Sequence, residues 1–552
     1  MPSATDLCFL SAAELAPMIE AREVSPVELV EAQLDRIAEQ DEVLRAFIHV
    51  DREGALKQAR AAEAEIASGS YRGPLHGITV AHKDIIDVRG MPTTGASRVI
   101  APRIATEDAT VQARLRAAGA ICLGKLNLIE FASGSMGVYG FARNPWDLAA
   151  YPGGSSSGSG TALASGLVTI ATGTDTGGSV RNPACFCGLA GMRATYGRVS
   201  RHGCIPLSWS QDSIGPMARS VADAALMLEV MAGPDRRDAT AAARTVPDFS
   251  ADLLQGAAGL RVGVPDSFFF DDLDPEIEAA LDEAIARMKD LGAHISEVSL
   301  PASEYASAAS WTIAYSESFV FHREWFETRS KDYTPAFYHK IAAAGLTSAP
   351  ERIVSQQVRQ AVTREFAGVM RDIDVIVTPT SRTLAPADRR ADQPVSHSSR
   401  WQADMASVTR PLSLTGYPAM SVPIGFARDG TPMGMQLVGR PWEEATLFRL
   451  GHAYEKLAGW SSRRPPAIPA RVPPRYGSAS VPPVVVEDGS PVGAAWVMGM
   501  ARLLGYGFIS EEDARAIAPM LAPVKDQLAE ARRSLRLDLE PPTRAAGWPF
   551  AG

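Results

Sequence analysis

"YPGGSSSGSGTALASGLVTIATGTDTGGSVRNPACFCG", residues 151–188, decides how this chain folds and which chemistry it can perform. Two blocks of glycine and serine flank an apolar run. That run, "TALASGLVTIATGTD", predicts a buried helix followed by a buried strand. A flexible glycine-serine linker would continue into another polar tract, so the pattern argues against a linker. The stretch therefore predicts serine hydroxyls held on permissive backbone against a core.

The second block, "TDTGGS", is suited to binding an oxyanion. Its consecutive small residues leave backbone N–H groups free to converge on one point. A helix predicted over "SVRNPACFCG" adds its positive end behind the same point. A serine hydroxyl becomes a useful nucleophile only when a base takes its proton and the oxyanion is held. The first block can supply a relay hydroxyl for that proton.

Lys83 is the candidate base. The segment "PLHGITVAHKDIIDV" predicts a buried strand that ends near this lysine. Burial disfavours the charged ammonium and can lower a lysine pKa by about 3 to 5 units from its usual value of about 10.4. Lys83 can therefore be neutral and accept a proton. His82 beside it is a candidate for tuning that base, although packing is the favoured interpretation.

Other motifs compete for the first block. Gly154–Gly158 matches the G-x-S-x-G elbow of α/β-hydrolases, but "NPWDLAAYPGG" predicts a loop where the elbow needs a strand. A Ser-His-acid triad would need His397 or His452, and neither has a supporting sequence context. A phosphate loop is disfavoured because no Gly-Lys-Ser/Thr follows.

With its surroundings, the stretch resembles the amidase signature family, serine hydrolases that use a Ser-cisSer-Lys triad. The resemblance rests on "GGSSSGSG", on "GTDTGGSVRNPACFCGLAGMRATYGRVSRHG" and on the upstream lysine segment "GITVAHKDIIDVRGMPTTGAS". Further matching segments are "KLNLIEFASGS", "VIVTPT", "LTGYPAMSVPIG" and "GTPMGMQLVGRPWEE". Together they extend from about Leu10 to Arg464.

The resemblance implies an α/β fold, in which a central mixed sheet is flanked by layers of helices. It implies that Ser179 is the acylated nucleophile, Ser155 the bridging serine after a cis peptide bond, and Lys83 the base. The backbone amides implied to form an oxyanion hole are those of Thr176, Gly177, Gly178 and Ser179. The side chains implied to support the site are Ser156, Asp175 and Arg181.

The substrate is expected to be a small-molecule amide. Residues 301–400, where such enzymes choose substrates, are aromatic-rich and favour an aryl or bulky group, and Ile129 and Met136 are expected to shape an apolar acyl pocket. Alternatives are a carbamate- or urea-type hydrolase and a glutaminase-like subunit of an amidotransferase. The glutaminase role is disfavoured, because Ala406 stands where the resemblance to the glutaminase subunit implies an aspartate that helps to hold the glutamine amino group. Asp404 lies two residues away. A non-catalytic assembly protein is a remote alternative.

Composition bears on the partners and the compartment. The net charge of −9 argues against a nucleic-acid partner. The five cysteines are odd in number and scattered, unlike a disulfide framework. No signal-like segment or membrane-length apolar run is found, so a cytoplasmic protein without membrane contacts is expected. We also expect a homodimer, no cofactor and no metal, because no ligand cluster has metal spacing.

The chain is expected to divide into three parts. Residues 1–464 form the amidase signature catalytic domain, residues 465–491 a proline-rich linker, and residues 492–552 a helical extension. The extension resembles the small helical partner subunits found beside some amidase-family enzymes. Pro519 and Pro523 are expected to kink its second helix or delay its start.

An apolar stripe in the extension recurs at helical spacing and needs a partner surface. Its members are Leu503, Leu504, Ile517, Leu521, Val524, Leu528 and Leu535. The two helices alone bury too little surface to be stable, so the stripe is expected to dock on the catalytic domain or on a neighbouring subunit. Trp548 and Phe550 are expected to anchor an extended C-terminal segment.

Overall fold

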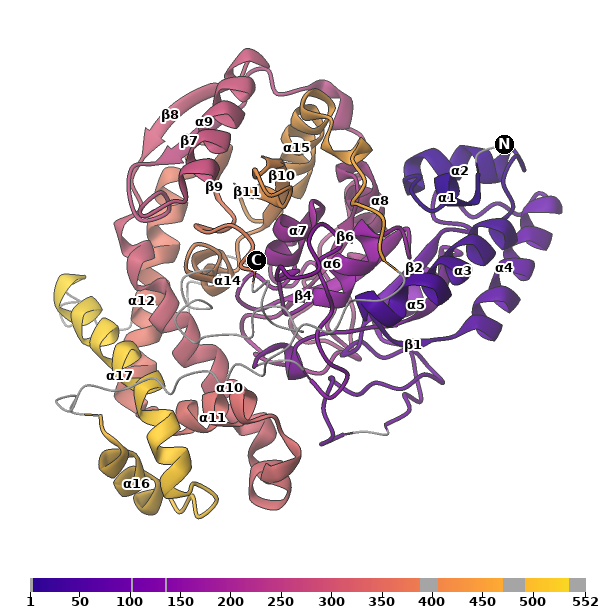
Figure 1. Cartoon of the computed structure of the whole chain (residues 1–552). Coiled ribbons are helices and arrows are strands. Elements are labelled where there is room, and N and C mark those ends of the chain that lie inside the picture. Colours follow the sequence, from indigo (N-terminus) through magenta and orange to yellow (C-terminus); the bar gives the residue numbers. More distant parts are fainter. Residues whose placement is uncertain (1–2, 101–102, 135–136, 388–405, 470–491, 536–552) are drawn as a thin grey trace.

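The computed structural model describes residues 3–100, 103–134, 137–387, 406–469 and 492–535. One mixed sheet of eleven strands runs through this part of the chain, with helices on both faces (Figure 1). This architecture confirms the predicted α/β fold with a central mixed sheet. In spatial order the strands are β1 (Phe47–Val50), β3 (Ile121–Leu126), β2 (Thr79–Lys83), β4 (Ile170–Asp175), β6 (Ser213–Ala218), β5 (Ala190–Arg193), β10 (Ala419–Phe426), β11 (Pro432–Gly439), β9 (Val375–Pro379), β7 (Arg261–Pro265) and β8 (His294–Val298).

The helices divide into three groups along the chain. Those before the first glycine-serine block are α1 (Ala4–Leu7), α2 (Ala12–Glu20), α3 (Pro26–Leu44), α4 (Arg52–Ala67) and α5 (Thr110–Ala117). Those that follow are α6 (Ser157–Ala164), α7 (Arg181–Cys187), α8 (Val221–Met231), α9 (Pro275–Asp290), α10 (Ala306–Arg329), α11 (Pro335–Gly345), α12 (Ala349–Val369), α14 (Arg410–Thr415) and α15 (Glu444–Ala458). The last pair is α16 (Ala494–Leu503) and α17 (Glu511–Ser534). None of the helices in the described ranges is long and apolar enough to cross a membrane.

Successive residues of the central strand β2 face two different helical layers. Val80 is buried in a cluster that includes side chains of α5, α8 and α15. Ala81 is buried in a second cluster, with side chains of α3, α4, α6 and α7. This alternation is that of a strand buried on both faces. It carries on to the strand end, so that His82 and Lys83 point to opposite faces of the sheet.

The two glycine-serine blocks meet where β2 and β4 end. These strands are parallel neighbours, with Ala81 opposite Ala171 and His82 opposite Thr172. Parallel strands present their carboxyl ends at the same edge of a sheet, which is where α/β proteins bind ligands. The first block leads directly into α6, and the second connects β4 to α7. The order strand, loop and helix read from the sequence thus brings both blocks beside Lys83.

The C-terminal helix α17 packs on the layer formed by α10, α11 and α12, and α16 packs on α17 (Figure 1). Val497 of α16 and Ile517 and Leu521 of α17 are buried in one cluster with Ala342 and Leu346, at the end of α11. The docking on the catalytic domain that the apolar stripe predicts is therefore present. Of the stripe residues outside this cluster, some are buried and others are exposed.

The α16 part of the predicted stripe is wrong. Leu503 is 78% exposed and Leu504 40% exposed, because α16 instead turns Val497 and Ala501 toward the core. Further along α17, Leu528 is buried against the cluster that includes α12, as the stripe predicts, and Val524 and Leu535 are partly buried there.

The predicted delay of the second helix does not occur. Ser510 and Asp513 form a reciprocal cap at its first turn, and α17 continues through Pro519 and Pro523. A proline inside a helix costs about 3 kcal/mol, which the burial of neighbouring apolar side chains can offset. Most of the predicted linker, residues 470–491, and the predicted anchors Trp548 and Phe550 lie outside the described residues.

Disrupting the docked face of α17 is expected to destabilise the protein. Ile517→Asp places a charge in a fully buried apolar position and should lower the free energy of unfolding of the docked unit by about 3 to 5 kcal/mol. Leu503→Asp introduces the same charge at an exposed position and should change stability by less than about 0.5 kcal/mol. Thermal unfolding and proteolysis of the two variants measure the difference. Equal stabilities would show that the helices do not depend on this contact.

Candidate active site

Lys83 lies at the end of β2 and bonds to two hydroxyl groups. Its Nζ donates to Ser155 Oγ at 2.7 Å and to Thr174 Oγ1 at 2.8 Å. The side chain is fully buried, and burial lowers the pKa of Lys83 to about 7. Nearby Asp212 and Asp175 favour the charged form but do not reverse this effect. Lys83 is thus suited to exchange a proton at neutral pH.

A second buried lysine, Lys125, differs from Lys83 in having a carboxylate partner. Lys125 of β3 is also fully buried, but its Nζ forms an ion pair with Asp84 Oδ1 at 2.7 Å. It also donates to the Pro92 carbonyl oxygen at 2.9 Å. In the described part of the chain, Lys83 has no carboxylate within 4.0 Å and is surrounded by hydroxyls instead. The structure therefore distinguishes a buried lysine with a carboxylate partner from one whose pKa burial lowers to about 7.

The first glycine-serine block holds Ser155 against the lysine. The peptide bond between Gly154 and Ser155 is cis, as the family resemblance implies. Gly154 is enclosed so closely that a Cβ there would lie 2.3 Å from Tyr151 Oη and 2.4 Å from Ile129 Cδ1. Ser156, the next residue, bonds through its hydroxyl to the backbone of Thr174. Ser156 thus joins the loop to β4, in line with its predicted supporting role.

Asp175 ties the second block to the sheet. Its carboxylate accepts hydrogen bonds from Gly178 N at 2.9 Å and from Arg181 Nε and Nη2, both at 2.9 Å. Arg193 of β5 adds a third cationic contact at 3.3 Å. Although burial opposes the charge, Arg181 and Arg193 hold the pKa of Asp175 well below its usual range. The bracing role predicted for Asp175 and Arg181 matches this geometry, and Arg193 is an addition to it.

Removing the Asp175 carboxylate is expected to be costly. Asp175→Ala would leave Arg181 and Arg193 buried without their counter-charge, and breaking a buried ion pair from one side costs about 3 to 5 kcal/mol. Denaturant unfolding should show a loss of that size. Asp290→Ala, which removes an exposed carboxylate at the end of α9, serves as the matched control and should be nearly neutral. A neutral Asp175→Ala variant would contradict the bracing role.

The oxyanion loop differs in one donor from the predicted set. The N–H of Gly178 already donates to Asp175, so it is not free to bind an oxyanion. No described atom accepts a hydrogen bond from the backbone N–H of Thr176, Gly177 or Ser179. These three amides stay as the candidate donors. Thr409 closes the loop from behind, because its Oγ1 donates to the Gly177 carbonyl oxygen at 2.6 Å.

A pocket with about 580 Å³ of empty volume gives access to these groups. Ser155, Gly177 and the partly exposed Ser179 all line it. Ile129 lines it as predicted, whereas Met136 lies outside the described residues. The rest of the lining is less apolar than the sequence suggests, because Tyr315 of α10, Lys340 of α11 and Arg410 of α14 face the same space.

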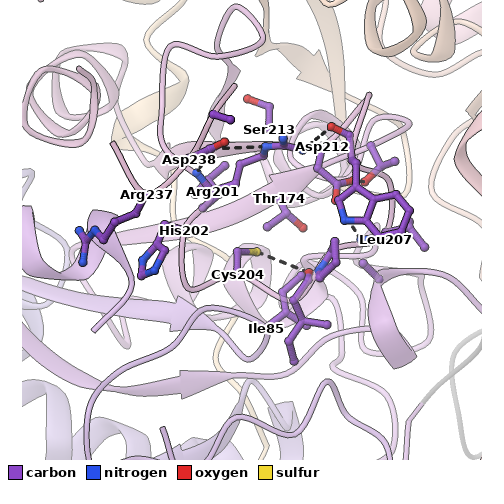
Figure 2. A pocket seen from close by; sticks show the side chains of 17 residues that line it. Ile85, Thr174, Arg201, His202, Cys204, Leu207, Asp212, Ser213, Arg237 and Asp238 are labelled. Carbon is purple, nitrogen blue, oxygen red and sulfur yellow. Dashed lines mark hydrogen bonds and ion pairs between the residues drawn. The ribbon is translucent and has the colours of Figure 1, made fainter. Parts of the chain in front are cut away.

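A second pocket adjoins the first on the side of the lysine. It has about 720 Å³ of empty volume and shares Ala132, Thr176 and Leu207 with the catalytic pocket. Figure 2 shows Thr174, the hydroxyl partner of Lys83, among its lining side chains together with Asp212. Asp212 fixes the loop from this side by accepting a hydrogen bond from Thr176 Oγ1.

The other candidate residues lie apart from the triad or outside the described ranges. His82 bonds to Thr172 and Gln112 on the opposite face of the sheet, and burial lowers its pKa to about 3, which agrees with the packing interpretation. His452 lies on α15 beside Glu455, and no described histidine lines the catalytic pocket. Ala406 lines the pocket. His397 and Asp404 lie outside the described residues.

Sequence reasoning missed several residues that complete the site. Thr174 belongs to the predicted strand and precedes Thr176 by two positions, so the sequence places it beside the second block, but no pattern marks it as a hydroxyl partner of Lys83. The other missed residues are Arg193, Thr409, Tyr315, Lys340 and Arg410, which belong to distant segments with no local motif. Within the described ranges no group of three or more His, Cys, Asp or Glu side chains could hold a metal ion.

Comparisons of the chain with a family model, with curated proteins and with solved structures agree on one family. A sequence model described as Amidase matches residues 28–448. The chain is 41% identical over 489 residues to a subunit of the glutamyl-tRNA(Gln) amidotransferase of Chloroflexus aggregans, covering 84% of this chain and 99% of that protein. Two solved structures are also similar. The peptide amidase of Stenotrophomonas maltophilia has 32% identity and a TM-score of 0.72, covering 83% of this chain and 98% of that one.

The second solved structure is described as a vestigial protein complex that reveals the origins of an s-triazine catabolic enzyme. It has 33% identity and a TM-score of 0.76, covering 81% of this chain and 98% of that one. These names contradict the predicted partners, which were a small-molecule amide, no nucleic acid, no membrane and a second copy of the chain. The first relative is named as one subunit of an amidotransferase, and the solved structure is named as a protein complex. Charge and composition carry no signal for such partners.

Proposed function

The chain belongs to the amidase family, and from that premise we propose that it hydrolyses a primary amide through an acyl-enzyme on Ser179. The observation that carries the proposal is the buried Lys83 Nζ, 2.7 Å from the Oγ of Ser155, a serine that lines the same pocket as Ser179. A lysine whose pKa burial lowers to about 7 can act as a general base near neutral pH.

The acylation step uses the two serines as a relay. Neutral Lys83 accepts the proton of Ser155 while Ser155 accepts that of Ser179, and Ser179 Oγ attacks the amide carbonyl carbon. The N–H groups of Thr176, Gly177 and Ser179 hold the resulting oxyanion. As the C–N bond breaks, the proton returns through Ser155 to the nitrogen, which leaves as ammonia.

The deacylation step repeats the relay with water. Lys83 and Ser155 take a proton from a water molecule, whose oxygen attacks the acyl ester on Ser179. The ester C–O bond breaks, Ser179 regains its proton, and the carboxylic acid leaves. The partly exposed position of Ser179 in the pocket supports access for both the amide and this water.

The relatives favour a glutaminase-type role over the aryl or bulky substrate that the aromatic-rich segment suggests. The 41% identity to the glutamyl-tRNA(Gln) amidotransferase subunit of Chloroflexus aggregans extends over 99% of that protein. A second candidate function is therefore the glutamine-hydrolysing part of an amidotransferase, acting with protein partners. In that case glutamine should exceed other primary amides in kcat/KM by at least about 100-fold.

Ammonia release across a panel of primary amides, with anilides, carbamates and ureas beside them, tests both functions. Ser155→Ala should lower kcat/KM by about 10² to 10⁴, the usual contribution of positioned proton transfer, and leave residual activity. Full activity in Ser155→Ala would contradict the relay. Absence of ammonia release from every primary amide would contradict the proposed reaction, and poor use of glutamine alone would contradict only the second function.

A further inference from the structure

Asp212 lies directly before β6 and joins two segments that line the active-site pockets. Its carboxylate accepts a hydrogen bond from Thr176 Oγ1 in the oxyanion loop. The same carboxylate accepts hydrogen bonds from the backbone N–H groups of Leu207 and Ser208, both at 2.9 Å. Thr176 and Leu207 line both pockets, so Asp212 fixes residues that the two pockets share.

Asp212 also lies on the side of the site where Lys83 is held. Strand β6 pairs with β4, and Ile214 stands opposite Thr174, whose hydroxyl accepts a hydrogen bond from Lys83 Nζ at 2.8 Å. Asp212 comes two positions before Ile214 and lines the same pocket as Thr174 (Figure 2). From this position its carboxylate acts on the charge of Lys83 and favours the ammonium form.

Three ionisable side chains oppose the lowering of the Lys83 pKa by burial, namely Cys204, Asp212 and Asp175. Burial raises the pKa of the Cys204 thiol well above its usual range, so this thiol is neutral near pH 7. The charge of Asp175 is already balanced by ion pairs with two buried arginines. Asp212 is the remaining group, and its three hydrogen-bond partners are neutral donors.

Several groups decide the charge of Asp212. Burial raises its pKa, whereas Arg201 and the three hydrogen bonds oppose this shift. A carboxylate that accepts several hydrogen bonds is stabilised in its ionised form, and a negative charge favours a nearby ammonium. The other ionisable groups that interact with Asp212 through their charge are Arg193, Tyr196 and Cys204.

The proposed acylation leaves Lys83 as an ammonium once it has accepted the proton of Ser155. A catalytic base is commonly supported by a third group that stabilises it in its charged form. We propose that Asp212 is a positioning residue that fixes Thr176 of the oxyanion loop and stabilises the ammonium formed on Lys83 during acylation. Asp212 itself takes up no proton in this step. The inference rests on the proposed amide hydrolysis and adds a residue to its machinery.

Asp212→Asn removes the charge and keeps a side chain of the same size. Because a neutral amide does not favour the ammonium, the pKa of Lys83 should fall. The rise of kcat/KM with pH, for a primary amide that the enzyme hydrolyses, should then have its midpoint about one pH unit lower than in the wild type. At alkaline pH, kcat/KM should fall about tenfold, since the charged base is less stable in the transition state. Equal midpoints in the wild type and a folded Asp212→Asn would overturn the proposal.

Further variants separate the charge from a structural effect. Asp212→Glu keeps the charge and should keep the wild-type midpoint, whatever its rate. Asp238→Asn removes a carboxylate that lines the same pocket but pairs with Arg201, and should leave the midpoint unchanged. Asp212→Ser is a second neutral variant and should show the same shift as Asp212→Asn. If neither neutral variant folds, Asp212 is a structural residue and the proposal is wrong.

A separate variant tests the hydrogen bond to the oxyanion loop. Thr176→Val keeps the backbone N–H and removes the hydroxyl that donates to Asp212. Because this hydroxyl fixes the loop, kcat/KM should fall about tenfold, the loss expected for a hydrogen bond to a charged group. Unchanged activity in Thr176→Val would contradict the fixing of the loop by Asp212.

The rate at which a fluorophosphonate labels Ser179 gives a second readout that needs no turnover. In the wild type this rate should rise as pH increases through about 7, and in Asp212→Asn the rise should move to lower pH as it does for kcat/KM. Labelling with the same midpoint in both proteins would overturn the role of Asp212 and leave the proposed function intact. A Ser179 that no fluorophosphonate labels would instead contradict the proposed function.

Discussion

Ser179→Ala is expected to lower kcat/KM for a primary amide by about 10⁵ to 10⁶, because the acyl-enzyme cannot form without this hydroxyl. Ser179 lines the pocket, is partly exposed and is flanked by the amide donors of the oxyanion loop. Ammonia release measures the loss, and intact mass after fluorophosphonate treatment should show an adduct on the wild type and none on the variant.

Ser157→Ala is the matched control for this change. Ser157 belongs to the same glycine-serine stretch but begins α6 and does not line the pocket. Its removal should leave the adduct and most of the activity. If Ser179→Ala kept more than about a hundredth of wild-type activity, the nucleophile would have to be another residue. Ser155 is the next hydroxyl in reach of Lys83 and would become the candidate.

Lys83→Met is expected to have an effect of similar size, about 10³- to 10⁵-fold on kcat/KM, and to change the dependence on pH. The base must be neutral to accept a proton. Because burial lowers the pKa of Lys83 to about 7, wild-type activity should rise as pH increases through about 7 and then level off. The residual activity of Lys83→Met should lack this rise. A wild-type profile that is flat from mildly acidic to alkaline pH would contradict the neutral lysine.

The melting temperature of Lys83→Met distinguishes a loss of catalysis from a loss of folded protein. A lysine whose folded pKa lies near 7 and whose unfolded pKa lies near 10.5 binds fewer protons in the folded state between these values. Its contribution to the free energy of unfolding therefore increases with pH across that window, and it is unfavourable near and below pH 7. Lys83→Met removes the penalty, so its melting temperature at neutral pH should equal or exceed that of the wild type. A lower melting temperature would mean that methionine disturbs the site by packing.

Much of the fold and the triad could be predicted because the signals are local. The period-2 pattern before Lys83 ends in a buried strand, and that strand is β2. The apolar run between the two glycine-serine blocks becomes α6 and β4, with each block at an element end. Glycine at position 154 is required by the close approach of Tyr151 and Ile129. Propensity, periodicity and backbone constraint agree in this part of the chain.

The pocket could not be predicted, because its chemistry depends on residues that only tertiary structure brings together. Tyr315, Lys340 and Arg410 lie on three helices, and none belongs to a motif that marks it as part of a site. The aromatic residues around α10 favour an aryl or bulky substrate in the sequence, whereas the structure adds the polar side chains of Lys340 and Arg410 to the pocket lining. Likewise, the glycine-rich pattern does not reveal that the N–H of Gly178 donates to Asp175. This bond removes Gly178 from the predicted donors of the oxyanion hole.

The exposed end of α16 shows a similar limit of prediction from sequence. Leu503 follows the helical spacing of the apolar stripe, yet it is 78% exposed while Val497 and Ala501 are buried. Spacing identifies a face within one helix, but the rotation of a short helix against its neighbour depends on the packing of both. For α17, which is longer and packs along α11 and α12, the stripe identified Ile517, Leu521 and Leu528 correctly.

The central claim is that Ser179 carries the acyl group during turnover. Rapid acid quenching of the enzyme with a slowly hydrolysed amide, followed by intact mass and peptide mapping, tests it most directly. We predict a mass increase equal to the acyl group, located on Ser179 within the segment "TDTGGSVR" and absent from Ser179→Ala. An acyl group on any other residue, or turnover with no acylated enzyme together with normal rates in Ser179→Ala, would contradict the account.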